Sequence, residues 1–115
     1  MPDFQTLKEG TISELVELGG QEFLDELIEI FFEHTPLKIQ EAENALAAGN
    51  LIDVEKSAHA IKSSAGNMGG EALHHLCQTI ENQAREHNES GLAELVSNLK
   101  DEYEKIAALL QSRHS

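Results

Sequence analysis

The residues best suited to chemistry lie in one short segment, "SAHAIKSSAGNMGG", which covers residues 57–70. It places a histidine, a lysine and three serines among apolar residues that are spaced as in a helix. The same segment contains Gly66 and Gly69, although glycine inside a helix costs about 1 kcal/mol relative to alanine. A helix that needed only stability would not carry these residues, so the segment is a candidate functional site.

The helical period predicts that the histidine points outward. At roughly 100° per residue, one apolar stripe gathers within about 40° of a common direction. The stripe comprises Val54, Ala58, Ile61, Ala65 and Met68. His59 lies roughly 140° from that direction, with Ser63 and Gly66 one and two turns later on the same side. Lys62 is expected beside it, as a mobile positive charge within reach of the imidazole.

An exposed imidazole can act as a nucleophile, a general base or a metal ligand. For zinc, the neighbouring Glu55 is a weak second ligand, and Lys62 would repel a cation. No oriented set of serine, histidine and aspartate suggests acyl transfer. A phosphoryl group suits these residues better, because it is anionic, bonds to a nucleophilic nitrogen and is stabilised by a nearby ammonium.

The elements that position this segment are all predicted to be helical. No stretch alternates polar and apolar residues with period two, and glycine, asparagine and proline divide the chain. A short helix over 11–18 is closed by Gly19 and Gly20. Thr35 and Pro36 resemble an N-cap and a first-turn proline, which predicts a kink or restart there. Longer helices are expected over 21–48, about 51–67, about 70–87 and about 91–111.

Four long amphipathic helices with short connections are typical of an antiparallel four-helix bundle. We therefore predict an all-α fold, with about residues 1–20 as a cover that contains the short extra helix and about 21–111 as the bundle. A chain of 115 residues can bury a core as one domain, so we assign 1–115 to a single domain. Cys77, in register with Leu73 and Ile80, is predicted to be a small core residue.

The charge balance disfavours two classes of partner. Eight basic and twenty-one acidic residues give a formal charge of −13, without the positive footprint of a nucleic-acid binder. Anionic membrane surfaces are disfavoured for the same reason. The single cysteine cannot form an internal disulfide, and neither a signal peptide nor an apolar run of about 20 residues is visible. We therefore expect a cytoplasmic protein. We also expect it to be a monomer.

The motif "HAIKSSAGNMG", from His59 to Gly69, closely resembles that of histidine-containing phosphotransfer (HPt) domains. These domains share a histidine, a lysine after two intervening residues, then small residues and a glycine ten positions after the histidine. The segments "LGGQEFLDELIEIFFEHTP", "AGN" and "LHHLCQTIENQAR" fall in the order and spacing of free-standing bacterial members. The resemblance therefore covers nearly the whole chain.

The resemblance implies a phosphorelay carrier. Members of the family are four-helix bundles that accept a phosphoryl group from a receiver-domain aspartate of a hybrid sensor kinase. They pass it to the receiver aspartate of a response regulator, without autonomous catalytic activity and without a cofactor of their own. The Mg²⁺ is expected on the partner receiver domain. By position, His59 is the phosphoryl acceptor and Lys62 is the charge that supports it.

We expect the partner to dock on the helix around His59. The docking positions are Glu55, Ser63, Gly66 and Gly69. Gly66 would allow close approach, and Gly69 would help to end the helix. Ser63 departs from the glycine of many members, and its hydroxyl can bond either the phosphate or its own helix carbonyl.

The residue that orients His59 has two candidates. Some members of the family orient the phosphohistidine with a glutamine on the next helix. The matching region of this chain offers Glu81, with Gln78 one turn earlier. Either residue is therefore a candidate for orienting His59.

Two other function classes fit parts of the sequence. A helical module that binds receiver domains or other partners without being phosphorylated would share the fold, but it would not need His59 with Lys62. A metal-binding or ligand-binding bundle enzyme is disfavoured because paired Glu-x-x-His motifs are absent. The dimerising domain of histidine kinases usually has an acidic residue directly after its histidine, where this chain has Ala60.

Overall fold

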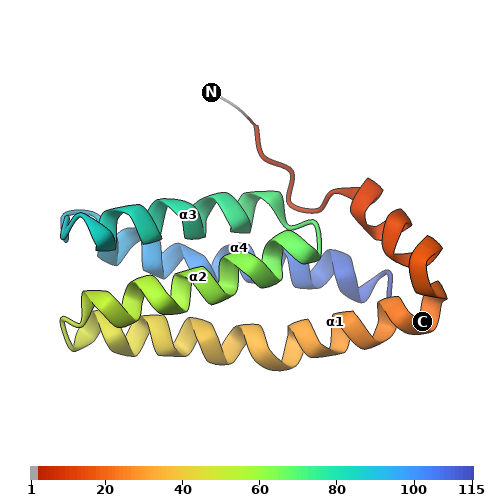
Figure 1. The fold of residues 1–115 in the computed structure, drawn as a ribbon, viewed down its shortest axis with the longest axis horizontal. Helices are drawn as coiled ribbons and strands as arrows, with labels where there is room; N and C mark the ends of the chain where they lie inside the picture. Colours follow the sequence, from red (N-terminus) through yellow and green to blue (C-terminus); the bar gives the residue numbers. More distant parts are fainter. Residues whose placement is uncertain (1–2) are drawn as a thin grey trace.

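The computed structural model describes residues 3–115, which form a bundle of helices (Figure 1). Met1 and Pro2, which the predicted domain range includes, lie outside the described residues. The helices are α1 (Glu9–Ala47), α2 (Leu51–Asn67), α3 (Glu71–Arg85) and α4 (Leu92–Gln111). The predicted all-α class is confirmed, and the predicted ends of the last three helices lie within two residues of those observed.

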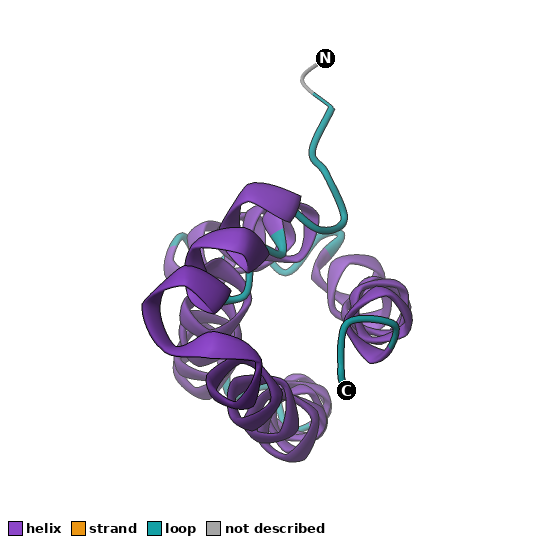
Figure 2. Cartoon of the chain, turned by 90° about the vertical axis from the view of Figure 1, so that its right-hand side faces the viewer, coloured by secondary structure: helices purple, strands orange, loops and turns teal. Residues whose placement is uncertain are grey.

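The four helices pack in a closed ring in which consecutive helices run in opposite directions (Figure 1). Helix α1 packs against α2 and α4, and α3 packs against the same two helices. The view along the bundle shows this ring, with the first stretch of α1 crossing its end (Figure 2). The antiparallel four-helix bundle that the sequence predicted is therefore confirmed.

The predicted short N-terminal helix is the first part of α1, and it bends away from the rest at Gly20. The backbone of Gly20 has φ 83° and ψ −179°, which side chains other than glycine rarely adopt. The apolar side chains of Leu7 and Ile12 are buried where this segment covers the end of the bundle. The extra helix is thus confirmed, continuous in sequence with α1 but separated from it by a kink.

Of the two outcomes predicted at Thr35 and Pro36, a kink or a restart, the restart is wrong. Within α1, non-helical angles occur only at Gly20, and the helix continues through Pro36. Thr35 is 2% exposed and lies inside the helix, so it cannot be an N-cap. A proline costs one helical hydrogen bond, but Phe31 and Ile39 on either side are buried in the core and hold both halves in one helix.

The apolar stripe of α2 lies in the core as predicted. Its five members are all buried, with exposures between 0 and 3%. The side chain of Asn50 caps the helix by accepting a hydrogen bond from the backbone N–H of Asp53 at 3.1 Å. No helix within residues 3–115 is long and apolar enough to span a membrane.

Candidate functional site

His59 lies in the middle of α2, on the side opposite the buried stripe. Its neighbours Ala58 and Ile61 are almost completely buried, and they fix the rotation of the helix. The His59 side chain is 62% exposed. The predicted outward orientation is therefore confirmed.

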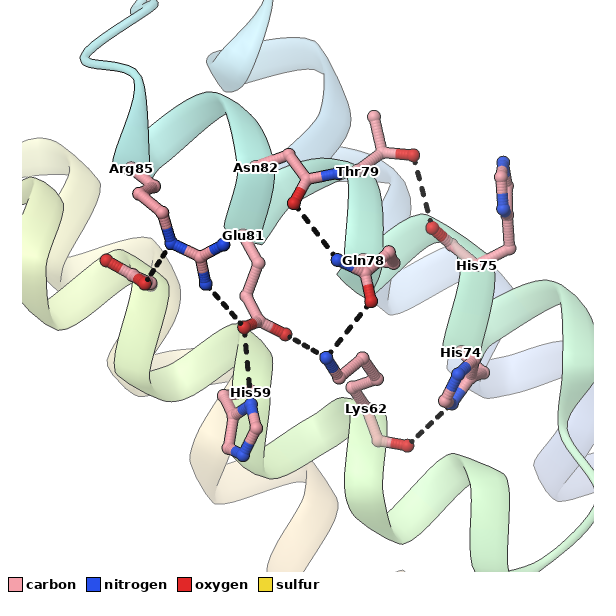
Figure 3. Close-up of polar contacts among 10 residues, drawn as sticks. His59, Lys62, His74, His75, Gln78, Thr79, Glu81, Asn82 and Arg85 are labelled. Carbon is pink, nitrogen blue, oxygen red and sulfur yellow. Dashed lines mark hydrogen bonds and ion pairs between the residues drawn. The ribbon is translucent and has the colours of Figure 1, made fainter.

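A buried carboxylate on α3, Glu81, faces the imidazole (Figure 3). Its side chain is 4% exposed, and its Oε2 lies 3.2 Å from Nδ1 of His59 and 3.3 Å from Nη2 of Arg85. Its Oε1 lies 2.7 Å from Nζ of Lys62. Burying a lone carboxylate costs several kcal/mol, and these three nitrogen groups offset that cost.

The pKa of Glu81 is lowered even though the group is buried. Burial raises the pKa of this carboxyl, but the hydrogen bonds from Lys62 and His59 and the attraction of their charges lower it by more. The side chain is therefore ionised at neutral pH, and an ionised carboxylate can only accept hydrogen bonds.

The charge on Glu81 selects the tautomer of His59. Nδ1 of His59 lies 3.2 Å from Oε2 of Glu81. Because the carboxylate can only accept a hydrogen bond, Nδ1 must carry the proton. In the neutral imidazole the lone pair then lies on Nε2. Figure 3 shows this second nitrogen on the far side of the ring from Glu81. The nucleophilic nitrogen of His59 thus points away from α3.

Replacing Glu81 with glutamine should reduce the acid sensitivity of folding. Because the folded pKa of Glu81 lies below its ordinary value of 4.5, the carboxylate stabilises the fold above that pH. This contribution is lost as the pH falls through the lowered folded pKa. We expect the free energy of unfolding, measured with denaturant between about pH 5 and pH 3, to depend less steeply on pH in Glu81→Gln. The control is Glu94→Gln, at an exposed position on α4. Equal pH slopes in the two variants would contradict the assignment.

Lys62 points toward α3 rather than into solvent, which corrects the expectation of a mobile charge. Its side chain is 17% exposed, and its ammonium contacts Glu81 and donates a hydrogen bond to Oε1 of Gln78 at 3.1 Å. Both acceptors come from α3, so the sequence of α2 alone could not reveal them. The ammonium of Lys62 therefore forms an ion pair with the buried carboxylate of Glu81.

Of the two candidates for orienting His59, Glu81 is the one that contacts the ring. Gln78 instead accepts from Lys62 and donates to Oδ1 of Asn82 at 3.0 Å. Gln78 therefore holds the ammonium, while Glu81 holds both the ammonium and the imidazole.

Gly66 is exposed, but a neighbouring helix already uses the space beside it. A methyl group at Gly66 would lie 3.1 Å from Nδ1 of His74, on α3. The same Nδ1 donates a hydrogen bond to the backbone carbonyl of Lys62 at 3.1 Å. Because Gly66 has no side chain, the His74 ring can lie against α2. The sequence predicted that the space beside Gly66 is open to a partner, but the His74 ring occupies part of it.

Replacing Gly66 with alanine should stabilise the protein more when His74 is absent. Alanine is about 1 kcal/mol better than glycine inside a helix, but in the wild type its methyl group crowds the His74 ring. In the His74→Ala background that crowding disappears, and the full gain should appear. Thermal melting of the wild type, both single variants and the double variant measures the coupling. An equal gain in both backgrounds would show that His74 does not occupy the space at Gly66.

The other predicted docking positions differ in accessibility. Ser63 is exposed, and Glu55 is half-buried and pairs with Nε of Arg85 at 2.9 Å. Gly69 is buried, with φ +79°, and a methyl group there would lie 2.8 Å from Cβ of Thr11. The docking role predicted for Gly69 is wrong, because the N-terminal segment covers it. Its expected role just after the end of α2 agrees with its position.

Two residues of this site, His74 and Arg85, were not predicted from the sequence. Together with Gln78 and Glu81 they follow the spacing i, i+4, i+7, i+11, which places all four on one face of α3. A polar stripe of this kind directly after the motif helix was the available signal. It did not show which of its members would be buried.

Cys77 lies on the core side of α3 and takes no part in the polar cluster. It is completely buried. Burial, with a smaller contribution from the charge of Glu81, raises the pKa of its thiol to about 12. It is therefore a protonated core residue, as predicted.

Comparison with known proteins agrees with this geometry. A model of the Hpt domain family matches residues 26–109, well over half of the chain. The phosphorelay protein LuxU of Vibrio vulnificus is 26% identical over 110 residues, which cover 96% of this chain and 87% of LuxU.

Two solved structures share the fold. Histidine-containing phosphotransfer protein B from Pseudomonas aeruginosa PAO1 superposes with a TM-score of 0.88 at 24% identity, covering 94% of each chain. The histidine-containing phosphotransfer domain of ArcB from Escherichia coli superposes with a TM-score of 0.82 at 22% identity, covering 93% of this chain and 91% of that one.

Proposed function

The chain belongs to the Hpt domain family and is a phosphorelay intermediate, and on this premise we propose that Nε2 of His59 carries the phosphoryl group. One observation supports the choice of atom above all. The ionised Glu81 lies 3.2 Å from Nδ1 of His59 and keeps a proton there. The lone pair therefore stays on the nitrogen that points away from α3, where another protein can reach it.

Transfer to His59 forms one bond and breaks one. The Nε2 lone pair forms the P–N bond while the P–O bond of an aspartyl phosphate breaks, and that electron pair leaves with the aspartate carboxylate. The Nδ1 proton stays on the ring, which gains positive charge as the bond forms. Glu81 stabilises this charge from a preorganised, buried position. Passing the phosphoryl group to a second aspartate reverses the same steps.

The partners that we propose are receiver domains. A hybrid sensor kinase would donate from its receiver aspartate, and a response regulator would accept on its own. The chain itself contributes a positioned nucleophile rather than a complete catalytic site, and we propose that it has no phosphotransfer activity without a receiver domain. The Mg²⁺ that neutralises the transferring group belongs, in this proposal, to the receiver domain.

Lys62 has a different role from the one that the motif suggested. Its ammonium lies on Glu81 and Gln78, so we propose that it neutralises the buried carboxylate and thereby holds Glu81 against His59. Lys62 would then act on the phosphoryl group only indirectly, by holding Glu81 in contact with His59.

Incubation with a receiver domain carrying a radiolabelled phosphoryl group tests the proposed function. We expect label to move onto the chain and to be labile in acid and stable in base, as a phosphohistidine is. Binding of the receiver domain without transfer would instead favour a docking module that is not phosphorylated.

A further inference from the structure

The nucleophilic nitrogen of His59 has no obvious cation beside it once Lys62 is committed to Glu81. A phosphoryl group bonded to this nitrogen adds two negative charges to a chain whose formal charge is already −13. A cation close to the transferring group would offset that repulsion. The question is which of the eight lysines and arginines can supply it.

Most cations of the described chain are already paired. Six of the eight lysines and arginines lie within 4.0 Å of a carboxylate; they are Lys8, Lys38, Lys62, Arg85, Lys105 and Arg113. Arg85 lies near His59, but its guanidinium is held by Glu55 and Glu81 together. Within residues 3–115, Lys56 and Lys100 have no such partner.

Lys56 is the unpaired cation near the site. It lies three residues before His59 on α2, is exposed, and shares with His59 the lining of an open recess of about 370 Å³. Glu81 and Arg85 lie on the α3 side of this recess. Residues three apart on a helix are neighbours on its surface, so the flexible side chain of Lys56 can reach a group bonded to Nε2.

We propose that Lys56 is the residue whose ammonium contacts the phosphoryl group, both on the incoming aspartyl phosphate and on phosphorylated His59. This inference rests on the proposed function, and it moves the charge support from Lys62 to Lys56. Lys56 takes no part in bond making; it attracts and positions the transferring group, while its own proton stays in place.

Three variants test this role: Lys56→Ala, Lys56→Arg and the matched control Lys100→Ala, which removes an unpaired lysine on α4. We expect Lys56→Ala to slow transfer from a phosphorylated receiver domain about tenfold, the size of one charge-assisted contact. Lys56→Arg should restore the rate to within about twofold of wild type, and Lys100→Ala should leave it unchanged to the same precision. Melting temperatures should be equal, because the Lys56 side chain makes no ion pair or hydrogen bond with residues 3–115 that its loss would break.

A spectroscopic measurement separates contact with the phosphoryl group from attraction of the partner. The ³¹P signal of the phosphorylated chain alone should titrate at a higher pH in Lys56→Ala than in Lys100→Ala, because a nearby ammonium favours the more negative form. Equal titration midpoints would overturn the proposal, even if transfer were slower, and so would equal transfer rates. If the wild type took no label at all, the proposed function itself would fail.

Discussion

His59→Gln should fold like the wild type and accept no phosphoryl group. Glutamine keeps a polar side chain at the same exposed position of α2, and Glu81 keeps Lys62 and Arg85 as partners. The free energy of unfolding should therefore change by about 1 kcal/mol or less. Because the nitrogen lone pair that forms the P–N bond is lost, labelling from a phosphorylated receiver domain should fall by more than about 1,000-fold.

The neighbouring histidines are the matched controls for this experiment. His74→Gln and His75→Gln each remove an imidazole from the exposed side of α3, where neither ring contacts Glu81. Both variants should keep the label at His59. Loss of labelling in either of them, with label retained in His59→Gln, would move the acceptor to α3 and end the assignment.

Lys62→Met should destabilise the protein strongly, by about 3 kcal/mol, because it leaves a buried carboxylate without its nearest cation. Methionine keeps the length of the apolar stem, so the loss isolates the charge. For a domain of this size the melting temperature should fall by roughly 10 °C. If Lys62 were instead a solvated charge that supports the phosphoryl group, melting would hardly change.

A double variant shows that the cost comes from Glu81. When Glu81→Gln is combined with Lys62→Met, no buried charge remains unpaired, so the double variant should be at least as stable as Lys62→Met alone. The control is Lys105→Met, which removes a lysine from an exposed pair with Glu102 and should cost about 0.5 kcal/mol or less. If the losses in free energy of unfolding caused by Lys62→Met and Glu81→Gln simply added in the double variant, the two residues would not be coupled and the explanation would be wrong.

The sequence predicted the elements well because local patterns determine them. The apolar stripe from Val54 to Met68 set both the existence of α2 and the outward direction of His59. The turn signals at Gly19 and Gly20 marked the kink that separates the cover helix. The restart predicted at Pro36 was wrong because that prediction considered only the local effect of a proline on a helix. In the structure, buried residues on both sides of Pro36 keep α1 continuous.

The polar cluster was harder to predict because it depends on the register between two helices. Nothing in α2 shows that Lys62 reaches across to Gln78 and Glu81, and nothing in α3 shows that Glu81 is the buried member of its stripe. The same holds for Gly66, whose open space is filled by His74 from α3. Contacts of this kind follow from tertiary packing, which a single sequence does not specify.

The central claim is that Glu81 leaves Nε2 of His59 as the phosphoryl acceptor, and NMR of the phosphorylated, ¹⁵N-labelled protein tests it most directly. The coupling between ³¹P and ¹⁵N identifies the nitrogen that carries the phosphoryl group. The account predicts coupling to Nε2 of His59 in the wild type. Coupling to Nδ1 of His59, or to a nitrogen of any other histidine, would contradict it.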